Sequence, residues 1–138
     1  MIMVDTNVVI DLLQHDPRWH RWSFEAVAAA QLEGEVAVSA IVMGELAPVA
    51  NDVAGLTAML DRLGLSVHDL AAPAAHRAGQ AHHAYRKAGG KRDKILADFL
   101  IGAHAVDQAD ALITRDPRHY RSYFPALALI SPSKDDHD

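Results

Sequence analysis

The chain contains no cysteine, and this absence excludes two kinds of site. Neither a disulfide framework nor a thiolate zinc site is available, so any metal must be held by oxygen or by histidine nitrogen. Oxygen ligands favour a hard cation such as Mg²⁺ or Mn²⁺. The N-terminal apolar run is short: it extends from Met1 to Val4, ends at Asp5, and is not preceded by basic residues. We therefore expect a cytoplasmic protein without a signal peptide or a membrane span.

Basic residues do not outnumber acidic ones in this chain. Thirteen Lys and Arg against eighteen Asp and Glu give a formal net charge of -5, which argues against nucleic-acid binding through the whole surface. The basic residues are unevenly distributed, however, and most of them surround Asp98 and Asp116. The cluster consists of Arg86, Lys87, Lys91, Arg92, Lys94, Arg115, Arg118 and Arg121.

Short apolar segments alternate with helical patterns along the chain. The length of 138 residues and the 50% hydrophobic content suit one domain with a real core, which we place at residues 1–132. Residues 133–138 form a charged tail that we expect to be flexible. Strands are predicted at residues 1–4, 36–40, 65–69, 111–114 and 127–130, and helices after Asp5 and at 19–32, 41–49, 56–63, 71–88 and 93–106. This order predicts an α/β fold with a parallel sheet of about five strands, covered by helices on both faces.

Four acidic residues stand out because each lies where an apolar segment has just ended or should continue. Asp5 and Asp116 follow two predicted strands, and the carboxyl ends of parallel strands are where ligands gather in such sheets. Glu45 and Asp98 each interrupt the apolar face of a predicted helix. Two ionised carboxylates about 4 Å apart repel by roughly 4 kcal/mol at an effective dielectric near 20. A divalent cation shared by these groups would offset that repulsion.

Taken singly, each acid also has an ordinary structural interpretation. Asp5 could cap a helix, Glu45 could be a solvated helix residue, Asp98 could pair with an Arg or a helix end, and Asp116 could belong to a turn. The other carboxylates, including Asp11, are predicted to be solvated.

Histidines and tryptophans suggest no further metal or stacking site. No His-Glu-x-x-His pattern is present, so we expect surface histidines, with His104 on the more polar side of its helix. Trp19 and Trp22 are predicted to lie in the core or in a subunit interface.

Four blocks of sequence together resemble the PIN-domain family, and within it the VapC-type ribonuclease toxins of type II toxin–antitoxin systems. The blocks are Met3-Val-Asp-Thr-Asn-Val-Val-Ile-Asp11, Ser39-Ala-Ile-Val-Met-Gly-Glu-Leu46, Ile95-Leu-Ala-Asp-Phe-Leu-Ile-Gly-Ala-His-Ala105, and Leu112-Ile-Thr-Arg-Asp-Pro-Arg-His-Tyr120 followed by Tyr123-Phe-Pro125. The resemblance implies a three-layer α/β/α sandwich, a Mg²⁺ or Mn²⁺ site, endonucleolytic cleavage of structured RNA such as tRNA or rRNA, a homodimer, and inhibition by a cognate antitoxin.

The resemblance also implies roles for single residues. Asp5, Glu45, Asp98 and Asp116 occupy the catalytic acidic positions, and Asn7 and Thr114 match supporting polar positions. We expect Asp5 and Asp98 to bind the metal directly, with Glu45 and Asp116 acting through water or at a second metal position, and a metal-activated water as the nucleophile. From the basic cluster we predict RNA contacts by Lys91, Arg92, Lys94, Arg115 and Arg118.

Two other functions compete with this one. A phospho-accepting receiver-like signalling domain could use Asp5, Asp69, Thr114 and Lys134, but it leaves Glu45 and Asp98 unexplained. A non-catalytic PIN-like RNA-binding module is disfavoured because no acid of the set is missing.

Overall fold

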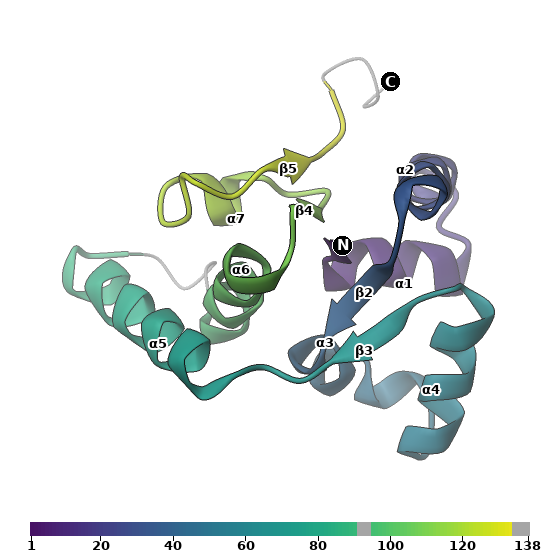
Figure 1. Ribbon diagram of the computed structural model, residues 1–138, viewed down its shortest axis with the longest axis horizontal. Coiled ribbons are helices and arrows are strands. Elements are labelled where there is room, and N and C mark those ends of the chain that lie inside the picture. Colours follow the sequence, from purple (N-terminus) through teal and green to yellow (C-terminus); the bar gives the residue numbers. More distant parts are fainter. Residues whose placement is uncertain (91–94, 134–138) are drawn as a thin grey trace.

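The computed structural model describes residues 1–90 and 95–133. Its centre is one sheet of five parallel strands in the order β3-β2-β1-β4-β5 (Figure 1). The strands are β1 (Ile2–Val4), β2 (Val36–Ser39), β3 (Ser66–His68), β4 (Ala111–Ile113) and β5 (Leu129–Ile130). All five coincide with predicted strands, which confirms the parallel sheet.

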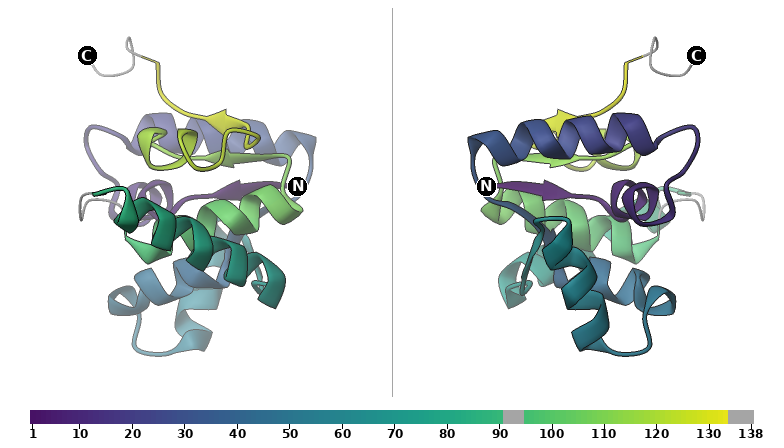
Figure 2. Two further views of the ribbon diagram at one scale, coloured as in Figure 1. Left: turned by 90° about the vertical axis from the view of Figure 1, so that its left-hand side faces the viewer. Right: turned by 90° about the vertical axis from the view of Figure 1, so that its right-hand side faces the viewer.

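Helices cover both faces of this sheet. Helices α1 (Thr6–Gln14), α2 (His20–Glu33) and α4 (Val53–Arg62) lie on one side, and α5 (Ala72–Lys87) and α6 (Leu96–Gln108) lie on the other (Figures 1 and 2). The short α3 (Ala40–Glu45) and the 3-10 helix η1 (Ala47–Val49) follow β2, and α7 (Arg118–Arg121) follows β4. The layers confirm the predicted α/β/α sandwich. Over the described ranges, we find no helix with the length and apolarity that a membrane crossing requires.

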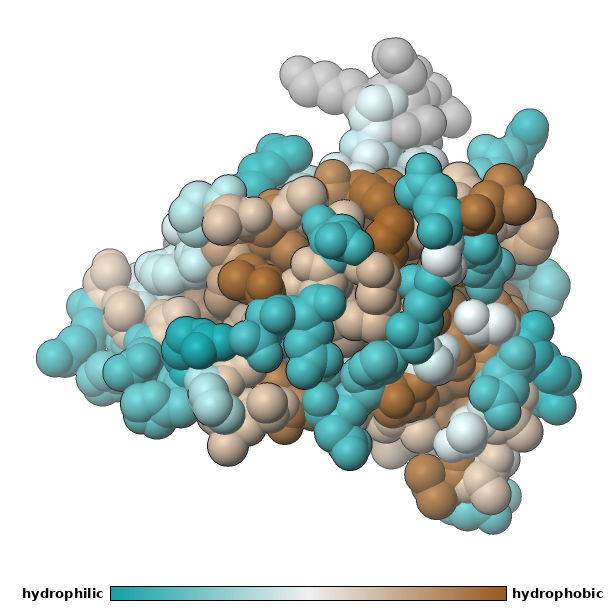
Figure 3. Space-filling view, in the orientation of Figure 1, coloured by the Kyte–Doolittle hydropathy of each residue, from teal (hydrophilic) through white to brown (hydrophobic). Residues whose placement is uncertain are grey.

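The main core lies between the central strands and the helices, where the apolar segments of the sequence are buried. Met3, Val38 and Leu112 come from the three central strands, and Val9 and Ile101 come from helices on opposite faces. Apolar strands buried on both faces are typical of parallel sheets. Outside the core, apolar side chains are scattered among hydrophilic ones on the face that Figure 3 shows.

Two helix boundaries differ from the sequence prediction. The helix expected over residues 41–49 ends as α3 at Glu45, and Pro48 lies in the 3-10 helix that follows, because proline cannot donate a helical backbone hydrogen bond. Glu45 is consequently exposed, which corrects its predicted place on a buried face. Helix α6 begins at Leu96, whereas the predicted start at Asp93 lies outside the described residues.

Two polar residues that we predicted at the surface are buried. Asp11 is 1% exposed and His104 is 0% exposed. Each has partners that are distant in sequence: Asp11 pairs with Arg115, and the His104 ring contacts Ser39. Amphipathic patterns alone cannot reveal such partners, which explains both errors.

Candidate active site

The carboxyl ends of β1 and β4 bring Asp5 and Thr114 together. Val4 pairs with Ile113 in the parallel register, so the residues that follow lie side by side. Asp5 Oδ2 accepts hydrogen bonds from the hydroxyls of Thr114 and Tyr120, each at 2.8 Å. Asp5 Oδ1 accepts the Thr6 backbone N–H at 2.8 Å. These three donors fix the orientation of the buried carboxylate.

Burial raises the pKa of Asp5 above its usual range, because a charged carboxylate is disfavoured away from water. The hydrogen bonds from Thr114, Tyr120 and Thr6 lower this pKa, and the Asp98 carboxylate raises it. Tyr120 is affected by the same charges: burial raises its pKa well above 10, and Asp5, Asp98 and Glu45 raise it further. Several acidic groups therefore act on one another around Asp5.

Glu45 reaches this centre from the end of α3. The Thr6 hydroxyl donates to Glu45 Oε1 at 2.6 Å, while the Thr6 backbone N–H binds Asp5. Thr6 therefore links Asp5 to Glu45 through two hydrogen bonds. Its hydroxyl was not among our predicted site groups, and the partner that gives it a role is 39 residues away.

Asp98 lies in the first turn of α6, where its Oδ2 accepts the Ile95 backbone N–H at 3.2 Å. Burial raises the pKa of Asp98, His119 lowers it, and the nearby Glu45 and Asp116 carboxylates raise it. The helix-end interpretation therefore holds in part, since Asp98 does cap α6. The influence of Glu45 and Asp116 on the pKa of Asp98 indicates that these carboxylates lie near one another.

Asp116 completes the group at the start of α7, together with a histidine that sequence analysis missed. His119 Nε2 lies 3.1 Å from Asp116 Oδ2, and His119 Nδ1 lies 3.6 Å from Asp98 Oδ2. Arg118 Nε donates to Asp116 Oδ1 at 3.2 Å. The i,i+3 spacing of Asp116 and His119 could have indicated the first contact. No sequence signal indicates the contact with Asp98.

The predicted supporting residues also have definite contacts. Asn7 Oδ1 accepts the Arg115 backbone N–H at 3.3 Å, and Thr114 Oγ1 accepts the Asp116 backbone N–H at 3.0 Å. Both side chains therefore order the segment after β4, on which Asp116 lies. This is a structural role, and it is compatible with the supporting role that we expected.

The predicted RNA-contact residues fall into two groups. Lys91, Arg92 and Lys94 lie outside the described residues. Arg115 forms a bidentate ion pair with Asp11, at 2.7 and 3.0 Å, and its guanidinium lies over the Trp19 ring. Trp19 is 8% exposed, as predicted for a core residue.

A divalent cation fits the donor chemistry of the four acids. A carboxylate offers about four acceptor positions, and Asp5 uses one on Oδ1 and two on Oδ2, so one position on Oδ1 remains for a cation. Oxygen donors are those that Mg²⁺ and Mn²⁺ prefer. Within residues 1–90 and 95–133, no three acidic or histidine side chains are already grouped as a metal site. Binding would therefore require side-chain rotations.

The sequence matches the PIN domain family over residues 2–125. The chain belongs to this family. The fold of this PIN domain is similar to that of solved chains from "VapBC2 from Rickettsia felis bound to a DNA fragment from their promoter" and from VapBC-1 of nontypeable Haemophilus influenzae. The TM-scores are 0.68 and 0.66, the identities 22% and 20%, and each match covers 95% of this chain and 98% of the other.

A third similar structure is a toxin–antitoxin complex from Klebsiella pneumoniae, with a TM-score of 0.62, 21% identity, and coverage of 96% of this chain and 98% of the other. A comparison with curated proteins gave no significant match. Membership of the PIN domain family argues against the receiver-like alternative.

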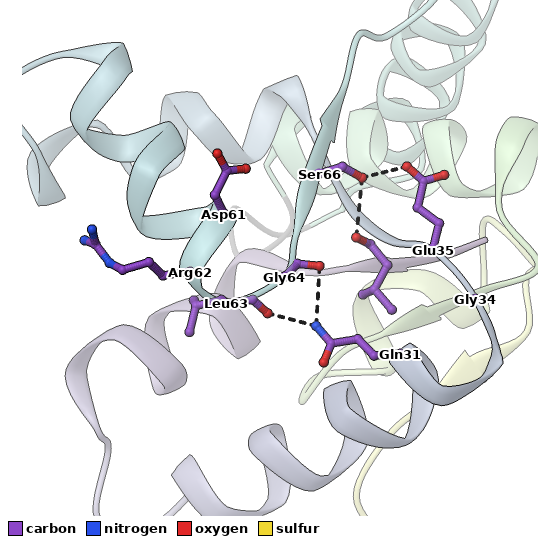
Figure 4. Close-up of a pocket in the computed structure, with 9 residues that line it drawn as sticks. Gln31, Gly34, Glu35, Asp61, Arg62, Leu63, Gly64 and Ser66 are labelled. Carbon is purple, nitrogen blue, oxygen red and sulfur yellow. Dashed lines mark hydrogen bonds between the residues drawn. The ribbon is translucent and has the colours of Figure 1, made fainter.

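A pocket of about 540 Å³ lies at the opposite end of the strands, where β2 and β3 begin (Figure 4). Its polar groups largely bind one another. Gln31 Nε2 donates to the Leu63 carbonyl at 2.8 Å, and Ser66 Oγ donates to Glu35 Oε2 at 2.7 Å. This pocket is separate from the acidic group and has no comparable constellation.

Proposed function

We propose that this PIN domain is a Mg²⁺- or Mn²⁺-dependent endoribonuclease and the toxin of a type II toxin–antitoxin system. It hydrolyses phosphodiester bonds in structured RNA such as tRNA or rRNA. The proposal is supported by the convergence of four acids from separate segments of the chain, Asp5, Glu45, Asp98 and Asp116. Thr6 binds both Asp5 and Glu45, and His119 contacts both Asp98 and Asp116. Membership of the PIN domain family supports the same activity.

The acids have different roles in this proposal. Asp5 and Asp98 bind the metal directly, and Glu45 and Asp116 act through water or at a second metal position. When bound, the cation lowers the pKa of a coordinated water and offsets negative charge at the scissile phosphate. Asp5 is preorganised for this role, because Thr114 and Tyr120 hold one oxygen while the other keeps an available acceptor position.

The partner assignments rest on similar proteins. Solved relatives include VapBC assemblies and a toxin–antitoxin complex, which supports a cognate antitoxin as partner of this chain. A homodimer and a cytoplasmic location, where tRNA and rRNA are found, belong to the same proposal.

The activity can be tested with purified protein and a tRNA and rRNA mixture. We expect cleavage with Mg²⁺ or Mn²⁺, none with EDTA, and recovery when the metal is restored. Sequencing the 5′ ends of RNA produced after brief expression would identify the cleaved molecule and position. Cleavage that persists in chelator would contradict a metal-dependent mechanism.

Three variants separate the acidic group from other carboxylates. Asp5→Asn and Asp98→Asn should each reduce cleavage by at least about a hundredfold, because each removes a charge that binds the cation. Asp107→Asn is the matched control: Asp107 is on α6 like Asp98, but it pairs with Arg77 at 3.0 Å. RNA binding by the wild-type protein without any cleavage would favour the non-catalytic module instead.

A further inference from the structure

A cleft of about 860 Å³ begins at Asp116, one of the four acids. Four parts of the chain form its walls: Asn7 of α1, the loop between α1 and α2, the segment from the end of β4 through α7, and the chain after β5. Its size lies within the range of about 300–1,000 Å³ that is typical of ligand pockets. The cleft is therefore large enough for part of a substrate and is continuous with the candidate active site.

The cleft is strongly cationic in a chain whose net charge is -5. Only one carboxylate, that of Asp116, is among the described residues that line it, against four guanidinium groups from Arg18, Arg115, Arg118 and Arg121. An anionic ligand is therefore favoured.

The four arginines differ in how they are engaged. Arg115 is neutralised by Asp11, and Arg118 pairs with Asp116. Arg18 and Arg121 are exposed and make no ion pair within the part of the chain that the structure describes. These two residues can bind a ligand without first breaking a salt bridge to a described carboxylate.

Arg18 is also held in place. Its guanidinium lies 5.2 Å from the centroid of the buried Trp19 ring, a cation–π arrangement that limits the motion of the long side chain. The Asp16 carboxylate accepts the backbone N–H groups of Arg18 and Trp19 at 2.9 and 2.8 Å, which orders the loop. Prior ordering reduces the entropy that Arg18 loses when it binds a ligand.

We infer that this cleft binds the phosphates of the RNA strand on one side of the scissile bond, with Arg18 and Arg121 as phosphate contacts. The inference rests on the proposed function. Guanidinium groups bind phosphate oxygens in a bidentate manner. A strand that is cut in its interior must continue beyond the acids, and the cleft is a cationic path that begins at one of them. This continuity favours an RNA strand over an acidic peptide.

The test measures binding of a short fluorescein-labelled single-stranded RNA in EDTA by fluorescence anisotropy, for the wild type, Arg18→Ala, Arg121→Ala and the double variant. We expect each single variant to weaken binding roughly tenfold at low salt. The slope of log K against log salt should decrease by about 0.7 for each phosphate that a variant no longer binds. Arg18→Lys should recover part of the affinity, because it retains the charge without the planar fork.

Arg21→Ala is the matched control. Arg21 is on the neighbouring helix α2, its side chain is 91% exposed, and it pairs with Glu25 away from the cleft lining. Its RNA affinity and salt slope should equal those of the wild type. Unchanged melting temperatures would establish that all variants are folded.

The results separate this inference from the proposed function. Wild-type protein that cuts no RNA with Mg²⁺ would refute the proposed activity. If the wild type cuts RNA but the Arg18 and Arg121 variants bind it with wild-type affinity and salt slope, the cleft assignment is overturned. The same applies if these variants lose only the binding of a polyglutamate probe, because the cleft would then serve an acidic peptide.

Discussion

Asp5 Oδ2 accepts hydroxyl hydrogen bonds from both Thr114 and Tyr120, and this arrangement opposes the effect of burial. Burial favours the neutral acid, whereas the hydrogen bonds favour the carboxylate and fix its direction. A nearby cation would favour the carboxylate further. Asp5 therefore combines a fixed orientation with a charge that burial disfavours, which is a common feature of functional sites.

His104 is a second buried group with a perturbed pKa, and it lies away from the acids. Its Nδ1 lies 2.7 Å from the Ser39 hydroxyl oxygen, and its Nε2 lies 3.3 Å from Gln108 Oε1. Burial lowers the pKa of His104 below 6.5; the Gln108 hydrogen bond and the Asp107 charge act in the opposite direction, and His68 lowers it further. The folded state therefore favours the neutral form of the His104 ring.

This environment predicts that stability falls in mild acid. The unfolded chain binds a proton at His104 more readily than the folded chain does. The contribution of the neutral His104 ring to stability is therefore fully present above pH 6.5 and decreases as the pH falls toward the lower pKa of the folded state. The contribution changes by at most about 1.4 kcal/mol per pH unit. Urea unfolding between pH 8 and pH 5 should show this decline, and His104→Gln should reduce it. The exposed His83 provides the control His83→Gln, and equal slopes in both variants would refute the assignment.

An ion pair joins the segment after β4 to the buried face of α1. Arg115 donates twice to Asp11, and Ser23 of α2 donates to Asp11 Oδ2 at 2.7 Å. Asp11 is 1% exposed, whereas the Arg115 side chain is 26% exposed. The arginine can therefore turn toward water if its partner is removed, but the aspartate cannot.

This asymmetry predicts unequal effects of two substitutions. Arg115→Ala leaves a buried carboxylate without its counter-charge and should lower the free energy of unfolding by about 3 kcal/mol. Asp11→Ala should cost less, and the double variant should be more stable than Arg115→Ala. Chemical denaturation of the three proteins measures these differences. Additive effects of the two substitutions would contradict an energetic coupling between Asp11 and Arg115.

Helix α6 approaches the chain after α7 closely at Gly102. A Cβ added at Gly102 would lie 2.5 Å from Phe124 Cε2, so the ring would have to move, whereas a Cβ at Gly79 of α5 would meet nothing within 4 Å. Gly102→Ala should therefore destabilise the fold by about 1–3 kcal/mol. Gly79→Ala should stabilise it by roughly 0.5–1 kcal/mol through helix propensity. Thermal unfolding of both variants checks the contrast, and a stabilising Gly102→Ala would contradict the close packing.

The molecule as a whole combines a net charge of -5 with a group of acids at one end of the sheet and an adjacent cationic cleft. A net negative surface does not attract RNA, so the RNA binding that we propose depends on local attraction. In the function that we propose, this separation of charges allows the same end of the sheet to bind a cation and a polyanion. The pocket at the opposite end of the strands is also polar, but it does not combine an acidic group with a cationic cleft.

Metal binding should stabilise the whole fold, because a ligand that binds only the folded state raises its stability. At a concentration one hundred times the Kd, the gain is about 2.7 kcal/mol. We expect Mg²⁺ to raise the melting temperature of the wild type at constant ionic strength. Asp98→Asn should reduce the shift, and Asp107→Asn should preserve it. An equal shift in Asp98→Asn would remove Asp98 from the metal ligands that we propose.

The strands, the parallel α/β/α fold and the places of Asp5 and Asp116 directly after two strands could be predicted from the amino-acid sequence alone. Apolar strands of this kind require burial on both faces, and the positions of Asp5 and Asp116 after strands follow from local order along the chain. Such features depend on neighbours in sequence and are therefore readable from it.

The partners of these residues depend on how the chain packs in space and could not be predicted from the sequence. Each of these partnerships joins segments that are far apart in the chain. Examples are the contact between His119 and Asp98, the hydrogen bond between Thr6 and Glu45, and the position of Arg18 and Arg121 on one cleft. The burial of Asp11 and His104 likewise depends on distant partners. The energies of burial, hydrogen bonding and charge pairing depend on distances in space. Those distances are set when the helices pack onto the sheet, and no local pattern specifies them.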